Sequence, residues 1–395
     1  MKDNEITRYA ESLQDYMVEM RRKFHEHPEL SGEEHNTRKI LIEEIEKMGF
    51  KYRLLPGTGI IAFIEGGQPG KNRLLRADID GLPVQEETVN LSGHEKVCVS
   101  KDDGLCHACG HDVHMTVLLG TMKLLQHFQD RVKGTVYCCF EEGEETNCGI
   151  ATMMEALEDY QIDECYGMHV LNVLEAGKVD IQAGPRMAGM LRFGVKFKGK
   201  AGHGSRPDQA LNPITPAAHA LAMVDSAMVN KITAGETVTM GFSKFVGGSQ
   251  YNVIPEEAVL EGSGRYFNVE EGEKAFKFVT KIMEDTADSF GCGVEFLDTH
   301  KIALLPVVND AEVSERVQKA VAETCGEDCL GHAEKWFASE TYGRYIEKHP
   351  GVLAFLGIKN DKLGSGAAHH NGKFDVDESV MPLGVCAAAC FVLSD

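Results

Sequence analysis

The chain has 395 residues, a length that predicts two or three domains. It carries 40 Lys and Arg against 61 Asp and Glu, a formal net charge of −21, which argues against general binding to nucleic acid phosphates. No apolar run approaches the roughly 18 residues of a membrane span, and the charged start lacks the apolar core of a secretory signal. Its 12 Cys are too dilute for a disulfide-built scaffold, which predicts a cytoplasmic protein.

Helices alternate with short apolar strands through the first half of the chain. Residues 5–25 and 33–48 have the apolar spacing of amphipathic helices, and a buried helix begins near Asp112. The predicted strands are 60–64, 73–77, 135–140 and 164–170. This alternation predicts an α/β sheet with helices on both of its faces.

A second pattern begins near Gly184, where apolar and polar residues alternate strictly through 190–200. The elements predicted after this strand are helix 212–230, strands 237–245 and 257–267, helix 270–290 and strand 294–302. The order β-α-β-β-α-β is the ferredoxin-like motif. We therefore expect a small domain at 185–302, inserted into a larger domain formed by 1–184 and 303–395.

The densest chemistry lies in LCHACGHDVHM, residues 105–115. Thiolate and imidazole are ligands that suit zinc and related divalent metals. Three functional sites fit this pattern: a structural zinc knuckle, a C-x-x-C redox pair, or half of a catalytic metal site at a strand-to-helix corner. The long apolar helix that follows argues against the knuckle, and scattered core cysteines and solvated histidines remain the non-functional alternative. The candidate ligands are Cys106, His107, Cys109, His111 and His114.

Further polar clusters follow predicted strands of the first domain. The strand 135–140 runs directly into four carboxylates, and adjacent acids at a strand end can act separately, one as a metal ligand and one as a base. A solvated acidic turn is the alternative for any one such cluster. Several clusters in one α/β domain favour a shared site. Their members are Asp78, Asp80, Glu141, Glu142, Glu144, Glu145, His169, His369 and His370.

The inserted block carries candidate ligand contacts of its own. His203 lies between glycines, where backbone can approach a ligand closely, although an ordinary glycine-rich turn has the same composition. Asn252 and Arg265 lie on the same block, and an Arg fork binds carboxylates bidentately. The chain has no G-x-S-x-G elbow and no P-loop spacing, and GTGIIA at 57–62 continues as a strand, unlike a dinucleotide fingerprint.

On these residues the chain resembles the dinuclear metallopeptidases of the aminoacylase and carboxypeptidase type. Within them it is most similar to the branch that contains hippurate hydrolase and the indole-acetyl-amino-acid hydrolases. The matching stretches occur in family order over nearly the whole chain, and HACGHD is specific to this branch. They are FHEHPELSGEE (24–34), RADIDGLP (76–83), HACGHDVH (107–114), EEGEE (141–145), GMHV (167–170), GKAGHGSRPD (199–208), NVIPEEAVLEGSGR (252–265) and HHNGKFDVDE (369–378).

The resemblance implies a zinc-peptidase-like catalytic domain, with helices on both faces of a mixed sheet, and an inserted lid that is often used for dimerisation. It implies two divalent metal ions, manganese or zinc, with cobalt and nickel as further candidates. Glu144 corresponds to the general base, Asp80 to the acid that orients a ligand, and His203 to the lid residue that polarises the scissile carbonyl. The implied metal ligands are Cys109, His111, Glu145, His169 and His370.

The chain departs from the family pattern at three positions that we expect to border the substrate. Q-P-A before the paired acids is replaced by residues 141–143, M-P-H in the lid by 206–208, and S-E-D-F by 339–342. The implied metal ligands and base survive all three changes. Hippurate and auxin conjugates are therefore not carried over as substrates.

These features predict metal-assisted hydrolysis of an amide bond in an N-acyl or aroyl amino acid, or a similar small carboxylate-bearing amide. Glu144 would act as the base, and Arg265 or Asn252 would meet the substrate carboxylate. The alternatives are a dipeptidase or aminoacyl peptidase on the same scaffold and a non-catalytic metal-binding protein. We expect a homodimer or higher homo-oligomer through the lid, with no nucleic-acid or membrane partner.

Overall fold

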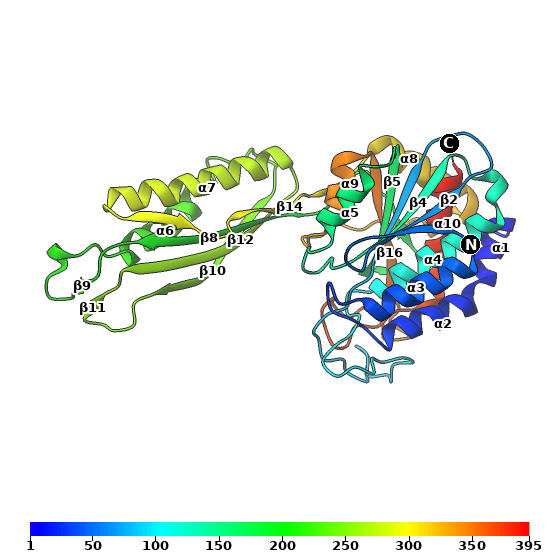
Figure 1. Ribbon diagram of the computed structural model, residues 1–395, viewed down its shortest axis with the longest axis horizontal. Coiled ribbons are helices and arrows are strands. Elements are labelled where there is room, and N and C mark those ends of the chain that lie inside the picture. The colour runs from blue at the N-terminus through cyan, green and yellow to red at the C-terminus, as the bar shows by residue number, and fades with distance from the viewer. Residues whose placement is uncertain (395) are drawn as a thin grey trace. The chain divides into compact units, whose positions relative to one another are not determined.

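The computed structural model describes residues 1–394, which form two compact units (Figure 1). The first unit comprises Met1–Arg186, Asn309–Glu334 and the chain from Arg344 onward. The second comprises Met187–Val308 and Lys335–Gly343. Residues 335–343 were expected in the larger domain with the rest of 303–395, and no periodic pattern in the sequence marks them as part of the second unit.

A seven-stranded mixed sheet, of order β1-β2-β4-β3-β5-β16-β6, forms the centre of the first unit. β3 runs parallel to β4 and β5, and β16 runs parallel to β5, whereas β1, β2 and β6 pair antiparallel. The carboxyl ends of β3, β4 and β5 therefore meet at one edge. The strands are β1 (Lys51–Leu54), β2 (Ile60–Glu65), β3 (Arg73–Asp78), β4 (Thr135–Glu141), β5 (Glu164–Glu175), β6 (Val179–Asp180) and β16 (Gly351–Lys359).

Helices cover both faces of this sheet, which confirms the predicted fold class. Six of them share one core with one sheet face, and α9 contacts the other face, where the Tyr345 hydroxyl donates to the Glu141 carboxylate at 2.7 Å. The six are α1 (Glu5–Ser12), α2 (Gln14–His25), α3 (His35–Lys47), α4 (His111–His127), α8 (Ala311–Cys325) and α10 (Met381–Leu393). The remaining helices of the unit are α5 (Ile150–Leu157) and α9 (Gly343–Lys348).

The helix predicted over 5–25 is two helices, α1 and α2. At Leu13 the backbone N–H bonds to the Ala10 carbonyl three residues back, at 3.1 Å, which interrupts the α-helical pattern. The apolar spacing continues across this break, because Ala10, Met17 and Met20 are all buried in the same core. Periodicity alone therefore could not reveal it.

The second unit has the predicted ferredoxin-like order. Its sheet order, β10-β12-β8-β13, places the first and third strands of the motif in the middle. The strand predicted over 294–302 is two strands, because the chain turns between them, where the His300 N–H bonds to the Leu297 carbonyl at 2.8 Å. The elements are β8 (Gly189–Lys198), β9 (Gly202–His203), α6 (Ile214–Met228), β10 (Val238–Gly247), β11 (Val253–Ile254), β12 (Glu257–Tyr266), α7 (Val269–Ser289), β13 (Gly293–Phe296) and β14 (Lys301–Leu304).

Two short strands, β7 (Gly184–Met187) and β15 (Val307–Asn309), pair where the chain enters and leaves the second unit. Within residues 1–394, none of the helices combines the length and apolar character that crossing a membrane would require.

Candidate metal centre

The candidate site lies at the carboxyl ends of the parallel strands of the first unit. Asp78 ends β3, Glu141 ends β4, and His169 lies within β5. Functional groups collect at such an edge because loops leave the sheet there in the same direction. Helix α4 also begins here at His111, after Gly110 in a left-handed conformation with φ of 90°. One short segment thus supplies both Cys109 and His111.

The structure brings all five predicted metal ligands together in two overlapping groups. Cys109, His111 and His169 form one group and Cys109, Glu145 and His370 the other, with the donor atoms of each group within 4.8 Å of one another. The Cys109 Sγ is 3.5 Å from the His169 Nε2, and the Glu145 Oε1 is 3.3 Å from the His370 Nε2. Cys109 belongs to both groups, so its sulfur is the candidate for a shared ligand.

Hydrogen bonds orient the two buried histidines of these groups. The His111 Nδ1 lies 2.9 Å from the Asp80 carbonyl oxygen and 3.1 Å from the Asp80 Oδ1, so Nδ1 carries the proton and donates. The His169 Nδ1 likewise donates to the Val170 carbonyl at 2.7 Å. In both rings the Nε2 atom therefore faces the cluster. A donor that occupies the other ring nitrogen is the usual support of a metal-binding histidine.

The donor set fits a divalent cation. The His111 Nε2 and the Glu145 Oε1 are buried and have no hydrogen-bond partner among the described residues. Buried polar atoms without partners are costly, and a cation in contact with both would satisfy them. Thiolate, imidazole and carboxylate together suit zinc and manganese-type ions.

The four carboxylates at the end of β4 have separate roles. The Glu141 carboxylate accepts from Arg76 at 2.8 Å and from Tyr345 at 2.7 Å. The Glu142 carboxylate accepts from the Thr58 hydroxyl and backbone N–H and, at 3.0 Å, from the Gly59 N–H. These two acids hold the fold. The remaining pair, Glu144 and Glu145, groups with His111, with donor atoms within 4.8 Å of one another.

Asp80 links a histidine of the cluster to the acidic turn. One carboxylate oxygen lies against the His111 Nδ1, and the other accepts from the Ser31 hydroxyl at 2.7 Å and from the Glu145 N–H at 3.0 Å. Burial alone would raise the pKa of Asp80, but these hydrogen bonds, led by that of His111, outweigh it and lower the pKa. Asp80 is therefore held as a carboxylate that fixes two candidate ligands.

His114 is the candidate ligand that the structure uses differently. Its Nδ1 is 2.6 Å from the Asp78 Oδ1, and its Nε2 accepts the Val170 N–H at 2.9 Å. Both ring nitrogens are thus occupied, although its ring lies in the same buried cluster. Asp78 also accepts from Arg76 at 2.7 Å. His114 and Asp78 support the strand that carries His169, a role that spacing along α4 could not distinguish from ligation.

Burial and neighbouring charged groups set the pKa values of the side chains in the cluster. Burial raises the pKa of the Cys109 thiol well above its usual range. Burial opposes the charged form of His111, but the nearby Asp78 carboxylate and the Asp80 hydrogen bond outweigh it and raise the pKa of this imidazole. A metal ion must displace the thiol proton in order to bind, which makes affinity dependent on pH. Cys106 and His107 lie outside every ligand group found among the described residues.

His370 reaches the cluster from a loop with an unusual backbone. Its φ is 59°, in the left-handed region that non-glycine residues rarely adopt, and its N–H donates to the Ala108 carbonyl at 2.9 Å. The buried Lys96 ammonium donates to the Gly372 carbonyl at 2.7 Å and to the Glu86 carboxylate at 2.8 Å. The loop that carries His370 is therefore tied to the 86–96 segment.

The same segment joins a buried ionic network that our sequence reasoning did not identify. The Glu86 carboxylate is 3.0 Å from the His25 Nε2, and the His25 Nδ1 is 2.9 Å from the Asp112 Oδ2. Arg21 also donates to Asp112, at 2.7 Å. The signal was present, because Arg21 and His25 follow Met17 at four-residue spacing on the buried face of α2. It could not be paired with Asp112 without the fold.

The lid candidates lie in the second unit. His203 on β9 pairs with Val253 on β11, and the Gly204 N–H donates to the Asn252 carbonyl at 2.8 Å, so His203 and Asn252 are neighbours. The exposed His203 ring has its Nδ1 2.8 Å from the Ser205 hydroxyl. Arg265 is on β12, in the main sheet of this unit. The structure thus brings His203 and Asn252 together and places Arg265 on a separate strand.

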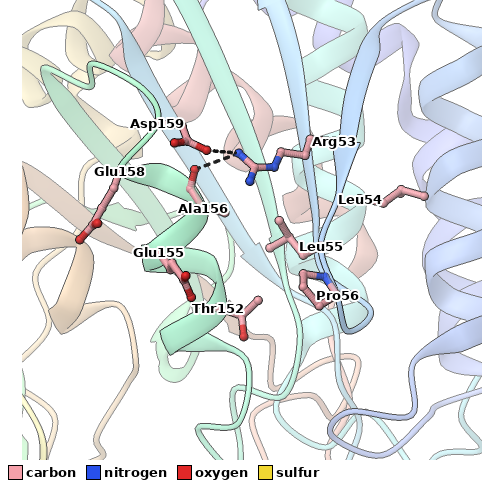
Figure 2. A pocket seen from close by; sticks show the side chains of 9 residues that line it. All are labelled: Arg53, Leu54, Leu55, Pro56, Thr152, Glu155, Ala156, Glu158 and Asp159. Atoms are coloured by element: carbon pink, nitrogen blue, oxygen red, sulfur yellow. Dashed lines mark hydrogen bonds and ion pairs between the residues drawn. The ribbon is translucent and has the colours of Figure 1, made fainter.

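A surface pocket of about 640 Å³ in the first unit contains none of the predicted site residues (Figure 2). Its lining includes the end of β1 and helix α5, and Arg53 points across it to the Asp159 carboxylate at 2.6 Å and the Ala156 carbonyl at 3.4 Å. The arginine is already paired there, so this pocket adds nothing to the site.

Comparison with known proteins gives concordant matches over the whole chain. The model of peptidase family M20/M25/M40 matches residues 74–394. Thermostable carboxypeptidase 2 of Saccharolobus solfataricus is 31% identical over 391 residues, covering 97% of this chain and 96% of its own. N-acetylcysteine deacetylase of Bacillus subtilis is 33% identical over 368 residues, covering 92% and 93%. The crystal structure of a dinuclear metal-binding peptidase of Bacillus subtilis superposes with a TM-score of 0.81 at 29% identity, covering 97% and 98%.

Proposed function

Because the chain belongs to peptidase family M20/M25/M40 and is a metal-dependent hydrolase, we propose that it cleaves the amide bond of an N-acyl or aroyl amino acid or a similar small carboxylate-bearing amide. The observation that carries this proposal is the pair Glu144 and Glu145 beside a buried cluster of sulfur and nitrogen donors. A binding protein needs ligands only, whereas an adjacent second carboxylate offers a base.

The proposed cofactor is a pair of divalent ions, manganese or zinc, with cobalt and nickel as further candidates. Cys109, His111, Glu145, His169 and His370 would hold them, in the two groups that share Cys109. Bound ions of this kind polarise a carbonyl and lower the pKa of water. A relative of known structure at 29% identity, described as a dinuclear metal-binding peptidase, supports two ions rather than one.

The chain's own residues then have separate tasks. Glu144 accepts a proton from the attacking water and returns it to the leaving amine. Asp80 orients His111 and Glu145, a role supported by its short contact with the His111 Nδ1 and by the hydrogen bond that it accepts from the Glu145 N–H. His203 donates a hydrogen bond to the oxyanion that forms at the carbonyl carbon. Asn252 and Arg265 bind the substrate carboxylate.

A peptidase that takes dipeptides is the second candidate function. It is favoured by the similarity to a carboxypeptidase over nearly the full length of both chains. The two functions differ in whether the acyl side of the scissile bond carries a free amine. A non-catalytic metal-binding protein, the third alternative, is disfavoured by the hydrolases among the relatives and by the Glu144–Glu145 pair.

A panel of matched substrates tests the proposal. Purified protein is assayed on N-acetyl and N-benzoyl amino acids and on the corresponding dipeptides, with manganese, zinc or cobalt added and with a chelator as control. We expect hydrolysis of the N-acyl compounds that the chelator abolishes and added metal restores. Hydrolysis of dipeptides alone would establish the second function, and no hydrolysis of either class with the metals bound would contradict both proposed substrate classes.

The proposed assembly is a homodimer, or a higher homo-oligomer, formed through the second unit, in the cytoplasm. β10 is the edge strand of its sheet and pairs only with β12 among the described strands. Its exposed side chains include Phe245 and Val246, which are 40% and 55% exposed. An apolar edge strand favours pairing with another strand. None of the 12 cysteines forms a disulfide in the described structure, as a reducing compartment requires.

A further inference from the structure

One face of the second unit's sheet carries no helix. The apolar side chains of β8, such as Leu191 and Phe193, pack with α6 and α7, which lie on one side of the sheet in Figure 1. Because side chains alternate along a strand, Met190 and Arg192 point to the opposite face. The exposed Thr239 and Ser263 belong to that face as well.

Strand register places three cations together on this open face. Arg192 on β8 is opposite Ser263 of β12 and opposite Lys301 of β14. Arg265 is opposite Met190, so it is the diagonal neighbour of Arg192. Directly opposite residues of antiparallel strands share a face, and diagonal neighbours lie about 7–8 Å apart. Arg265, Arg192 and Lys301 therefore form a row across three strands, which we call the cationic row.

The cationic row has no acidic partner within residues 1–394. The Arg192 Nε lies against the Met190 sulfur at 3.4 Å, and an Arg265 Nη donates only to the neighbouring Gly264 carbonyl, at 3.0 Å. Burial and the charge of Arg192 lower the pKa of Arg265. Two guanidinium groups repel one another at these half-buried positions. A bound anion that neutralises them would remove this repulsion.

Lysines elsewhere on the same face have acidic partners, which the cationic row lacks. Further along β8, Lys196 pairs with Glu257 at 3.7 Å and with Glu295 at 3.5 Å, and Lys198 also pairs with Glu295. The lysines at that end are thus neutralised by carboxylates of adjacent strands. Glu261, which lies on the same face and diagonal to Arg192, pairs with Lys244 of β10 instead, so the row has no carboxylate partner among the described residues although the protein has a net charge of −21.

We propose that the cationic row binds a small molecule with two carboxylates, one held by Arg265 and the other by Arg192 and Lys301. The spacing across three strands suits two anionic groups joined by a short carbon chain better than a single compact anion. The proposed function already assigns one substrate carboxylate to Arg265, and the second carboxylate proposed here rests on that function. Within the proposed class of N-acyl amino acids, the cationic row would favour derivatives of acidic amino acids, or similar dicarboxylates.

Binding without turnover tests this site separately from hydrolysis. The full-length protein is titrated calorimetrically with glutarate, with its monoamide glutaramate, and with inorganic phosphate. We expect glutarate to bind about 10-fold or more tightly than glutaramate, since one charge-assisted contact is lost in the monoamide. Equal affinities for the two compounds, no binding of glutarate, or equally tight binding of phosphate would overturn the proposal.

Substitutions locate the binding. Arg192→Gln and the exposed Lys301→Gln should each weaken glutarate binding by about 10-fold and remove its advantage over glutaramate. Lys198→Gln, on the same strand and face but paired with Glu295, is the matched control and should change affinity by less than about 2-fold. An equal loss in Lys198→Gln, or no loss in either row variant, contradicts the assignment. Hydrolysis of neutral N-acyl amino acids in the same variants reports on the proposed function independently.

Discussion

Glu144 and Glu145 are adjacent in the chain, yet the structure separates them from the two acids before them. Glu144→Gln removes a base while it keeps the size of the side chain. We expect metal content to stay at the wild-type level and kcat to fall by about 10²–10⁴. Elemental analysis and steady-state kinetics measure the two effects. Glu142→Gln is the structural control, expected to lower the free energy of unfolding through its bonds to Thr58. A near-normal kcat in Glu144→Gln would remove it from the mechanism.

Cys109 and Cys106 are both buried thiols three residues apart, but only Cys109 belongs to the ligand groups found among the described residues. Cys109→Ser replaces a soft ligand by a neutral hydroxyl and should weaken metal affinity by about 10-fold or more. Cys106→Ser should leave metal affinity unchanged. Metal titration with a chromophoric chelator measures both. Equal loss in both variants would indicate a zinc knuckle instead.

The proposed ligands were easier to nominate from the sequence than the residues that support them. Cys109, His111 and Glu145 stand in dense local motifs that match the family, and the structure brings these three residues into shared groups. His114 stands in the same motif, and only the bonds to Asp78 and Val170 show that both of its ring nitrogens are occupied. The position of Lys301 opposite Arg192 depends on the register of two strands over 100 residues apart in sequence, which no local pattern encodes.

The start of helix α4 shows how an element constrains the site. Gly110 has a φ of 90°, and a Cβ there would lie 2.4 Å from the Val170 Cγ2. Gly110→Ala should therefore lower the free energy of unfolding by about 2–4 kcal/mol and displace the ligands on either side. Gly49→Ala is the control that measures the cost of backbone strain without a steric clash. Gly49 has a φ of 74°, and a Cβ there would meet nothing within 4 Å. This substitution should cost about 1 kcal/mol in a denaturant titration. Equal costs would mean that the Val170 contact is unimportant.

The 86–96 segment makes the stability of the fold depend on pH. Burial would raise the pKa of Glu86, but hydrogen bonds from His25 and Lys96 outweigh it and lower the pKa to about 2. The folded state thus favours the ionised carboxylate, and this stability is present above about pH 4.5 and lost as the pH falls towards 2.

Glu86→Gln tests this dependence. We expect it to reduce the free energy of unfolding at pH 7 by about 1–3 kcal/mol, with a smaller difference from wild type at pH 3. Urea titrations at both pH values measure it. The neighbouring Glu87, half exposed and 3.9 Å from Lys373, serves as control, and Glu87→Gln should be nearly neutral at both. A constant difference between pH 3 and pH 7 would contradict the argument.

At the scale of the whole molecule, the proposed dimer should depend on the edge strand β10. Val246→Asp places a charge among apolar side chains there, and we expect light scattering to show a dimer in wild type and a monomer in the variant. Val173→Asp, at a position 67% exposed in the first unit, is the control and should leave the assembly unchanged. A wild-type monomer, or dissociation by both substitutions, would contradict a dimer through β10.

The strands are synthesised in an order that differs from their order in the sheet. β16 lies between β5 and β6, and about 175 residues, including the whole second unit, are synthesised between the end of β5 and the start of β16. At about 5–20 residues per second, the nascent chain carries an unpaired β5 edge for roughly 10–35 s. By the end of that interval all strands of the inserted unit have been synthesised, so this unit can fold. The apolar face of α4 still lacks α10, the helix that packs against it. We therefore expect the nascent first half to be prone to aggregation until the last strand and helix have been translated, and products of premature termination before Gly351 to aggregate.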